Sequence, residues 1–232
     1  MRLSKRIYKI AEKVDQGETV ADIGTDHGYV PMILIRDKIS PRAIMSDISE
    51  GSLAKAAETF ELCGLEADEA DFRVGDGLDT VAPAEVDSVI IGGLGGFTII
   101  DILDADISKS KSFKKLILQP RKHSGNLRYY LYTHGWDIAD EDLAPEGKFV
   151  CEVITAVPSE HYRPAPYPEE DIRWKYPAAI IDADRELAVK RISWKIGSIT
   201  EELENLKKST KDNSELTAKL ESDREYLKGI IR

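Results

Sequence analysis

Short β-type runs alternate with helical runs over residues 19–134, and this alternation constrains the fold more than any other feature of the sequence. The expected strands are Thr19–Ile23, Ala43–Asp47, Asp71–Val74, Asp87–Ile91 and Leu116–Gln119. The expected helices are Val30–Lys38, Glu50–Cys63, Thr98–Ala105 and Asn126–His134. Such alternation is typical of βαβ units, which place parallel strands side by side in one sheet.

Two further β-type runs, Asp137–Leu143 and Phe149–Val157, are separated only by Ala144–Lys148. A link this short favours antiparallel strands, since a parallel pair needs a crossover of about a dozen residues or more. We therefore expect an α/β fold, a Rossmann-like and mostly parallel sheet of seven strands. Before it, apolar Leu3, Ile7, Ile10 and Val14 recur at helical spacing and predict an amphipathic first helix.

The pattern changes after the sheet. Residues 158–177 contain Pro158, Pro164, Pro166, Pro168 and Pro177, which are incompatible with a helix interior or a central strand. Beyond them, apolar residues at alternating steps of three and four predict a helical hairpin of coiled-coil type. We expect a domain over residues 1–160, a proline-rich linker over 161–181 and the antiparallel hairpin over 182–232.

Composition excludes several classes of protein. The chain has 232 residues, 42% hydrophobic and 32% charged, with two cysteines. No apolar run approaches the ~20 residues of a membrane span, and no disulfide framework or metal-ligand spacing is present. We expect a cytoplasmic protein that binds neither membrane nor metal. The net charge of −10 argues against indiscriminate polyanion binding but leaves room for local basic patches.

The segment ADIGTDHGYVP places a turn directly after a strand and before a helix, where open α/β sheets bind nucleotides. Asp26 stands where a dinucleotide fingerprint has the glycine that approaches a pyrophosphate. That carboxylate and Asp22 would repel phosphates, whereas they suit a ligand with an ammonium and a sulfonium group. The segment therefore favours S-adenosyl-L-methionine.

The next two strand ends extend this site. Asp47 has the position of an acid that accepts the hydroxyl groups of a ribose. Gly75-Asp76-Gly77 ends the third strand, where an acidic side chain could meet the amino group of adenine. Each turn alone could be an ordinary solvated strand end. Three of them in register favour a cofactor site.

The fourth strand ends in IIGGLGG, whose glycines allow a flat substrate to approach the backbone closely. Methyltransferases that act on exocyclic amines commonly carry an Asn/Asp-Pro-Pro-aromatic segment here, and this chain has none. A ring nitrogen such as N1 of adenine already has an in-plane lone pair. It requires positioning more than general base catalysis. The alternative is a glycine-rich turn for tight helix–sheet packing.

Together these motifs resemble the bacterial tRNA (adenine(22)-N(1))-methyltransferases of the TrmK family. The resemblance rests on LSKRIYKIA, ADIGTDHGYVP, SDI, GDGL, IIGGLGG and LILQP, and it extends over essentially the whole chain. It implies a class I methyltransferase fold with a C-terminal coiled-coil hairpin, and methyl transfer from S-adenosyl-L-methionine to N1 of adenine 22 in tRNA, with S-adenosyl-L-homocysteine as product. Base-flipping is expected, because adenine N1 is hidden in a paired helix.

The resemblance also implies roles for individual residues. Those around the methionine end of the cofactor are Asp22, Gly24, Asp26, His27 and Gly28; those at the ribose are Asp47 and Ile48; those at the adenine are Gly75, Asp76 and Gly77; those near the methyl group are Gly92, Gly93 and Leu94. Asp26 is the candidate catalytic carboxylate, helping the adenine as it becomes cationic.

The expected RNA-binding residues are Arg2, Lys5, Arg6 and Lys9 of the first helix, Gln119 and Arg121 after the fifth strand, and Lys190, Arg191 and Lys195 of the hairpin. The hairpin could instead dock a protein or mediate self-association, and we expect a monomer or a weak homodimer. Two alternatives for the whole chain stay open: a methyltransferase for a small molecule or protein, and a cofactor-binding module without activity.

Overall fold

The computed structural model describes residues 3–65, 70–209 and 212–232. Its strands are β1 (Val20–Ile23), β2 (Ala43–Asp47), β3 (Ala70–Val74), β4 (Ser88–Leu94), β5 (Lys115–Pro120), β6 (Trp136–Glu146) and β7 (Phe149–Pro158). They form one sheet in the order β3-β2-β1-β4-β5-β7-β6. The first five strands are parallel, and β7 runs antiparallel to both β5 and β6. The predicted mostly parallel sheet of seven strands is confirmed.

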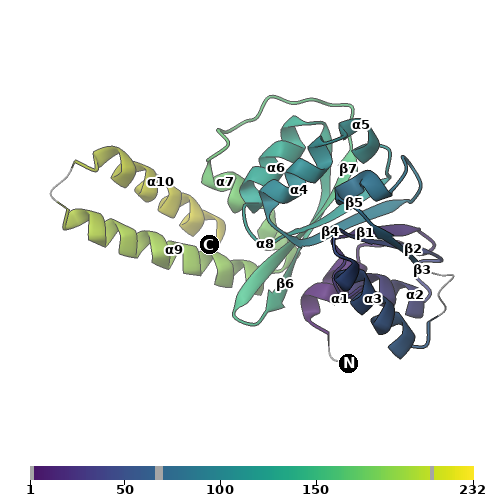
Figure 1. Cartoon of the computed structure of the whole chain (residues 1–232). Helices are drawn as coiled ribbons and strands as arrows, with labels where there is room; N and C mark the ends of the chain where they lie inside the picture. The colour runs from purple at the N-terminus through teal and green to yellow at the C-terminus, as the bar shows by residue number, and fades with distance from the viewer. Residues whose placement is uncertain (1–2, 66–69, 210–211) are drawn as a thin grey trace.

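The helices before the hairpin are α1 (Lys5–Ala11), α2 (Tyr29–Arg36), α3 (Glu50–Leu62), the 3₁₀ turn η2 (Gly77–Thr80), α4 (Gly96–Asp104), α5 (Ile107–Ser110), α6 (Ser124–Thr133), α7 (Ile172–Lys175) and α8 (Ile180–Ala183). Helices α1, α2 and α3 lie on one face of the sheet, and α4 and α6 lie on the other (Figure 1). The four-residue helices α5, α7 and α8 were not predicted, because a single turn is too short to show helical periodicity.

Buried apolar strands hold these layers together. Successive side chains of a strand point to opposite faces of the sheet. In β1, Val20 packs with the α1–α3 layer, whereas Ala21 and Ile23 pack with the α4–α6 layer. All four β1 residues are buried, as expected for a central strand covered on both sides.

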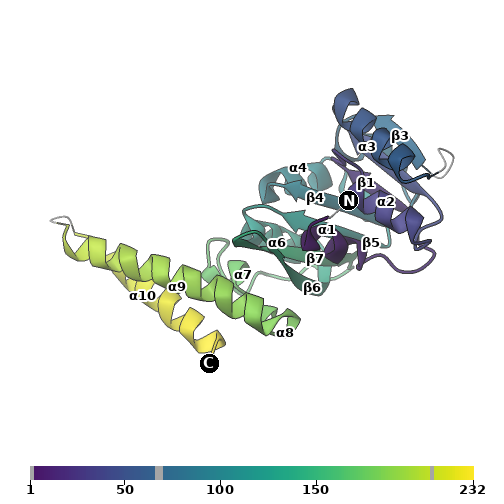
Figure 2. The ribbon, with the colours of Figure 1, turned by 90° about the horizontal axis from the view of Figure 1, so that it is seen from below.

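The C-terminal hairpin consists of α9 (Arg185–Lys207) and α10 (Ser214–Ile230), which lie side by side and project away from the sheet (Figures 1 and 2). A third apolar cluster joins it to the domain: Leu143 of β6, Tyr176 and Ile180 pack with Ile192 of α9 and Leu227 of α10. The base of the hairpin is therefore attached to the last strands of the sheet.

A buried ionic cluster strengthens that attachment. The guanidinium of Arg128, in α6, is 2% exposed and lies 2.6 Å from carboxylate oxygens of both Glu141 and Glu152. Arg191 of α9 pairs with the other oxygen of Glu152 at 2.7 Å. These ion pairs connect α6, β6 and β7 with the hairpin, and each charge lost would leave a buried partner uncompensated.

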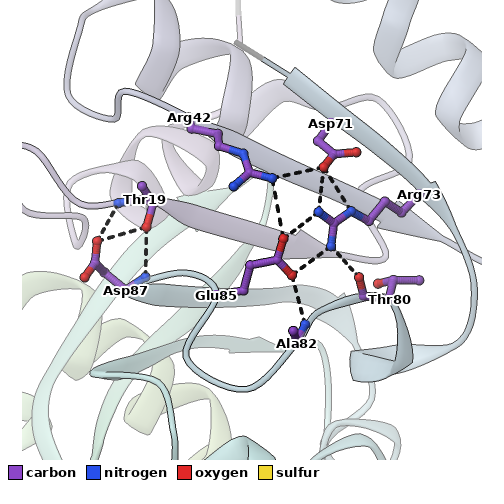
Figure 3. Close-up of polar contacts among 8 residues, drawn as sticks. All are labelled: Thr19, Arg42, Asp71, Arg73, Thr80, Ala82, Glu85 and Asp87. Atoms are coloured by element: carbon purple, nitrogen blue, oxygen red, sulfur yellow. Dashed lines mark hydrogen bonds and ion pairs between the residues drawn. The ribbon is translucent and has the colours of Figure 1, made fainter. Parts of the chain in front are cut away.

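A second polar cluster stabilises the edge of the sheet (Figure 3). Arg73 of β3 donates to Asp71, to both carboxylate oxygens of Glu85 and to the carbonyl oxygen of Thr80 at the end of η2. Arg42 contacts the same two carboxylates. These hydrogen bonds hold the 3₁₀ turn against β3 and so fix the loop that carries Gly75-Asp76-Gly77.

Candidate active site

A cavity of about 720 Å³ lies at the carboxyl ends of β1, β2 and β4. Chain order reverses between β1 and β4, and open α/β sheets bind ligands at such a switch point. The volume lies within the 300–1,000 Å³ typical of small-molecule and cofactor sites. Every predicted cofactor residue except Gly28 lines this cavity.

The β1 turn places a buried carboxylate against this cavity. Asp22 is 7% exposed and accepts a hydrogen bond of 2.7 Å from the hydroxyl of Thr25. Burial raises the pKa of Asp22 to about 6, and the hydrogen bond from Thr25 and the charge of Arg6 offset part of that shift. A positively charged ligand group beside Asp22 would favour the ionised carboxylate.

Gly24 has a φ of +74°, and a Cβ added there would meet only the side chain of Leu94, at 3.7 Å. The backbone at this turn is therefore open toward the cavity. Gly28, with a φ of +63°, is different: an added Cβ would lie 2.9 Å from the Cβ of Ala56 and 3.0 Å from the sulfur of Met45. Gly28 therefore allows α2 and α3 to pack closely, and it does not itself line the cavity.

Asp26 and His27 both line the cavity. The Asp26 side chain is 57% exposed, and its carboxylate pairs with Lys55 of α3 at 2.9 Å. His27 lies 3.5 Å from the same carboxylate, and its ring stacks on that of Tyr29 at 5.1 Å. Asp26 is thus accessible, but Lys55 compensates part of its charge.

The ends of β2 and β3 supply the next part of the wall. Asp47 lines the cavity and accepts a hydrogen bond of 2.8 Å from the backbone N–H of Ser49, which fixes one carboxylate oxygen. Ile48 is 74% exposed beside it. Gly75, Asp76 and Gly77 also line the cavity, on the loop that Arg73 stabilises.

The end of β4 contains a bulge. The register with β5 shifts between Gly92 and Leu94, and Gly93 has a φ of +81°. The N–H of Gly93 donates to the side-chain oxygen of Gln119 at 3.2 Å, and Arg6 donates to the same oxygen at 3.0 Å. The sequence had suggested that Gln119 contacts RNA, but this residue is 1% exposed. Gln119 instead joins α1 to the glycine turn.

Sequence reasoning missed that α1 forms a wall of the cavity. Arg6, Ile7 and Ile10 all line it. Helix α1 is held there by ion pairs from Lys9 to Asp142 at 3.0 Å and from Lys13 to the same carboxylate at 3.0 Å. The helical spacing of the apolar residues indicated a buried face, but no local signal shows that this face meets a cavity.

The structure places the predicted RNA-binding residues in different environments. Arg2 lies outside the described residues, whereas Lys5, Arg121 and Lys190 are exposed. Lys9 is paired with Glu12 and Asp142, and Arg191 pairs with Glu152, with 12% of its side chain exposed. Lys195 is half-buried. Arg191 is therefore a structural cation, which corrects its expected position on the RNA-facing surface.

The charges around the cavity define the ligand that it can take. Its acidic lining residues include Asp22, Asp26, Asp47, Asp76, Asp101 and Asp106, and its cationic lining residues are Arg6, Lys109 and Arg121. A dinucleotide would place its pyrophosphate at the β1 turn. None of these three cations belongs to that turn. The site suits a cationic ligand that carries a ribose. Among the described residues, no group of three or more His, Cys, Asp or Glu could hold a metal ion, and no helix is long and apolar enough to cross a membrane.

Comparisons with known proteins show which family the chain matches. Residues 3–154 match the model of a family described as methyltransferase domain. The chain is 35% identical over 156 residues to the tRNA (adenine(22)-N(1))-methyltransferase of Bacillus subtilis, a match that covers 67% of this chain and 65% of that relative's length.

Solved structures extend the likeness to the whole chain. The crystal structure of the B. subtilis m1A22 tRNA methyltransferase TrmK is 26% identical, with a TM-score of 0.80 over 100% of this chain and 99% of that one. The Streptococcus pneumoniae protein Sp1610, solved in complex with S-adenosyl-L-methionine, shares the fold over 100% of both chains with a TM-score of 0.82 at 24% identity. The chain belongs to the methyltransferase domain family and, within it, to the TrmK family.

Proposed function

We propose that this protein transfers a methyl group from S-adenosyl-L-methionine to N1 of adenine 22 in tRNA. The observation that carries the proposal is the acid-lined cavity at the β1/β4 switch point, next to a glycine bulge. The relatives described above act on tRNA according to their names, and family membership supports the same substrate here.

The residues present fit this cofactor. Asp22 is a buried carboxylate that accepts a hydrogen bond from the hydroxyl of Thr25, and its raised pKa indicates that it lacks a full compensating cation. The ammonium group of the cofactor would provide that charge. Asp47 would accept the ribose hydroxyls, and the open backbone at Gly24 leaves room for the ligand.

The cofactor supplies an electrophilic methyl group, and S-adenosyl-L-homocysteine is the product. The protein's contribution is positioning, because the in-plane lone pair of adenine N1 needs no prior deprotonation. Gly93 and Leu94 would form the surface beside the reacting atoms, with Arg6 and Gln119 fixing the bulge from behind. We propose Asp26 as the carboxylate that stabilises the positive charge developing on adenine, since it lines the cavity and is accessible.

The tRNA would approach over exposed cations. Arg121 after β5 lines the cavity, and Lys5 is exposed on α1, one residue before the lining residue Arg6. On α9, the exposed Lys190 and the half-buried Lys195 would extend the contact to the hairpin. Phosphate contacts of this kind position the RNA without reading its sequence. A tRNA substrate also supports our proposal that the protein acts in the cytoplasm. One chain carries every residue of the proposed cofactor site, so a monomer suffices for the chemistry.

The direct test is methyl transfer from labelled S-adenosyl-L-methionine to unmodified tRNA transcripts, with the product nucleoside identified by mass spectrometry. We expect 1-methyladenosine, and we expect it to disappear when adenine 22 is replaced by guanine. Cofactor binding without labelling of any RNA would contradict the proposal. It would favour a different methyl acceptor, or a binding module without activity.

The hairpin's role has a separate test. Lys190→Gln combined with Lys195→Gln should weaken tRNA binding and leave cofactor affinity unchanged, because neither residue lines the cavity. Lys114→Gln, at an exposed site beside Asp87 near the amino ends of the strands, is the matched control. Equal tRNA affinity of the double variant and the wild type would indicate a protein-docking or self-association role for the hairpin.

A further inference from the structure

Two aromatic rings lie together on the surface close to the cavity. Phe97, in the first turn of α4, is 46% exposed, and His123, just before α6, is exposed too. Their ring centroids are 4.4 Å apart with an interplanar angle of 36°. The pair therefore presents aromatic surface to solvent, and aromatic rings of this kind can stack on other flat rings.

The backbone beneath this pair is held firmly. Past the ends of β4 and β5, the N–H of Arg121 donates to the carbonyl of Leu94 at 2.7 Å, and the N–H of Gly96 donates to that of Lys122 at 2.8 Å. A Cβ added to Gly96 would lie 2.3 Å from the carbonyl oxygen of His123. His123 itself has a φ of +60°, in the left-handed region. The two loops are thus joined closely, so the backbone positions from which both rings project are held together.

The position of the pair relative to the cavity is specific. Neither ring lines the cavity, but the neighbours Leu94, Thr98 and Arg121 do. The rings therefore belong to the same two loops as these lining residues, on the side of the β4 and β5 ends, where Arg121 and Lys122 are exposed. Asp101 of α4 also lines the cavity on this side, but the exposed cations Arg121 and Lys122 lie beside the rings, whereas the β1, β2 and β3 ends contribute only aspartates among their charged lining residues. An RNA backbone would therefore be bound at Arg121 and Lys122.

We propose that Phe97 and His123 form a stacking platform for a nucleobase of the bound tRNA, next to the base that enters the cavity. This inference rests on the proposed function. A base that leaves its helix to reach the cavity deprives its neighbour of a stacking partner. An exposed aromatic pair replaces that partner, while Arg121 and Lys122 bind the adjoining phosphates. Stacking of this kind is sequence-tolerant, so the platform would hold the tRNA without selecting it.

The test uses Phe97→Leu and His123→Asn in the full chain. Leucine retains an apolar side chain without a ring, and asparagine tolerates the left-handed backbone of position 123. Each variant should raise the tRNA dissociation constant in filter binding by about fivefold or more, as expected from the loss of one base–aromatic stack. Cofactor affinity, measured by calorimetry, should stay unchanged. Phe97→Trp should bind tRNA about as tightly as the wild type, because tryptophan keeps an aromatic stacking surface that leucine lacks.

A fluorescence readout separates stacking from a merely structural role. 2-Aminopurine placed next to position 22 of the tRNA should be quenched by the wild type and not by Phe97→Leu. Tyr162→Leu is the control, since this ring is 69% exposed but lies beside Gly135, ahead of β6 and away from the cavity. If the wild type methylates tRNA and both platform variants bind it within twofold of wild type, the platform is refuted and the proposed function stands. If the wild type neither binds nor methylates tRNA, both are refuted.

Discussion

Asp22→Asn should make the protein more stable and a weaker cofactor binder at the same time. The Asp22 carboxylate is buried, and its pKa is raised to about 6 from the ordinary value of 3.8, chiefly by burial. A buried acid with a raised pKa opposes folding once it ionises. Asparagine has nearly the same shape and can still accept the hydrogen bond from Thr25.

The magnitude follows from the two pKa values. Each pKa unit corresponds to about 1.36 kcal/mol, so the ionised carboxylate costs up to about 3 kcal/mol of folding free energy above pH 6. The folded state holds the proton more tightly, so this cost falls as the pH is lowered toward 4 and is about half as large at pH 5. Removing it should raise the melting temperature of the unliganded protein by several degrees, at about 2–4 °C per kcal/mol.

Cofactor affinity should change in the opposite direction. Loss of a charge-assisted hydrogen bond costs about 1.5–3 kcal/mol, which is a 10- to 150-fold increase in the dissociation constant. Thermal melts of the unliganded protein at pH 7.5 and pH 5, with calorimetric titration of the cofactor at pH 7.5, measure both effects. A variant that is less stable at pH 7.5, or that binds the cofactor as tightly as the wild type, would refute the reasoning.

Two further predictions concern the ionic clusters. Arg128→Ala should lower the free energy of unfolding by about 3–5 kcal/mol in urea titrations, because it removes the buried cation that pairs with Glu141 and leaves Glu152 with Arg191 alone; a loss below 1 kcal/mol would contradict this. Glu85→Gln should flatten the acid limb of the stability curve. Hydrogen bonding from Arg73 lowers the pKa of Glu85 to about 2, so the wild type loses this contribution as the pH falls from about 4.5 toward 2, and an unchanged limb would exclude the assignment.

The sequence predicted most of the sheet because its strands are buried on both faces and read as continuous apolar runs. It predicted the acids of the β1 and β2 ends because parallel strands bring their carboxyl ends to one edge. It could not show the packing role of Gly28, since a glycine with positive φ beside a ligand and one beneath a packed helix have the same local sequence. The contacts with Met45 and Ala56 come from distant segments and distinguish the two cases.

The charged residues of the hairpin show the same difficulty. Arg191 was assigned to RNA with Lys190 and Lys195, because these cations precede the acidic residues of 201–204. Its partner Glu152 lies on β7, in another element, and no spacing along the chain connects the two. Likewise, the helical pattern of α1 indicated that Ile7 and Ile10 are buried, but the cavity that they border exists only once the sheet is assembled.

The docking of α1 has a consequence for the order of folding. Helix α1 is synthesised before any strand of the sheet, yet Lys9 and Lys13 bind Asp142 on β6, more than a hundred residues later. During translation the helix must wait until β6 has left the ribosome, at about 5–20 residues per second. A nascent chain that stops after β5 has every cofactor-binding turn but lacks the anchor of one cavity wall. Cofactor binding should therefore be acquired late, as one of the last steps of domain folding.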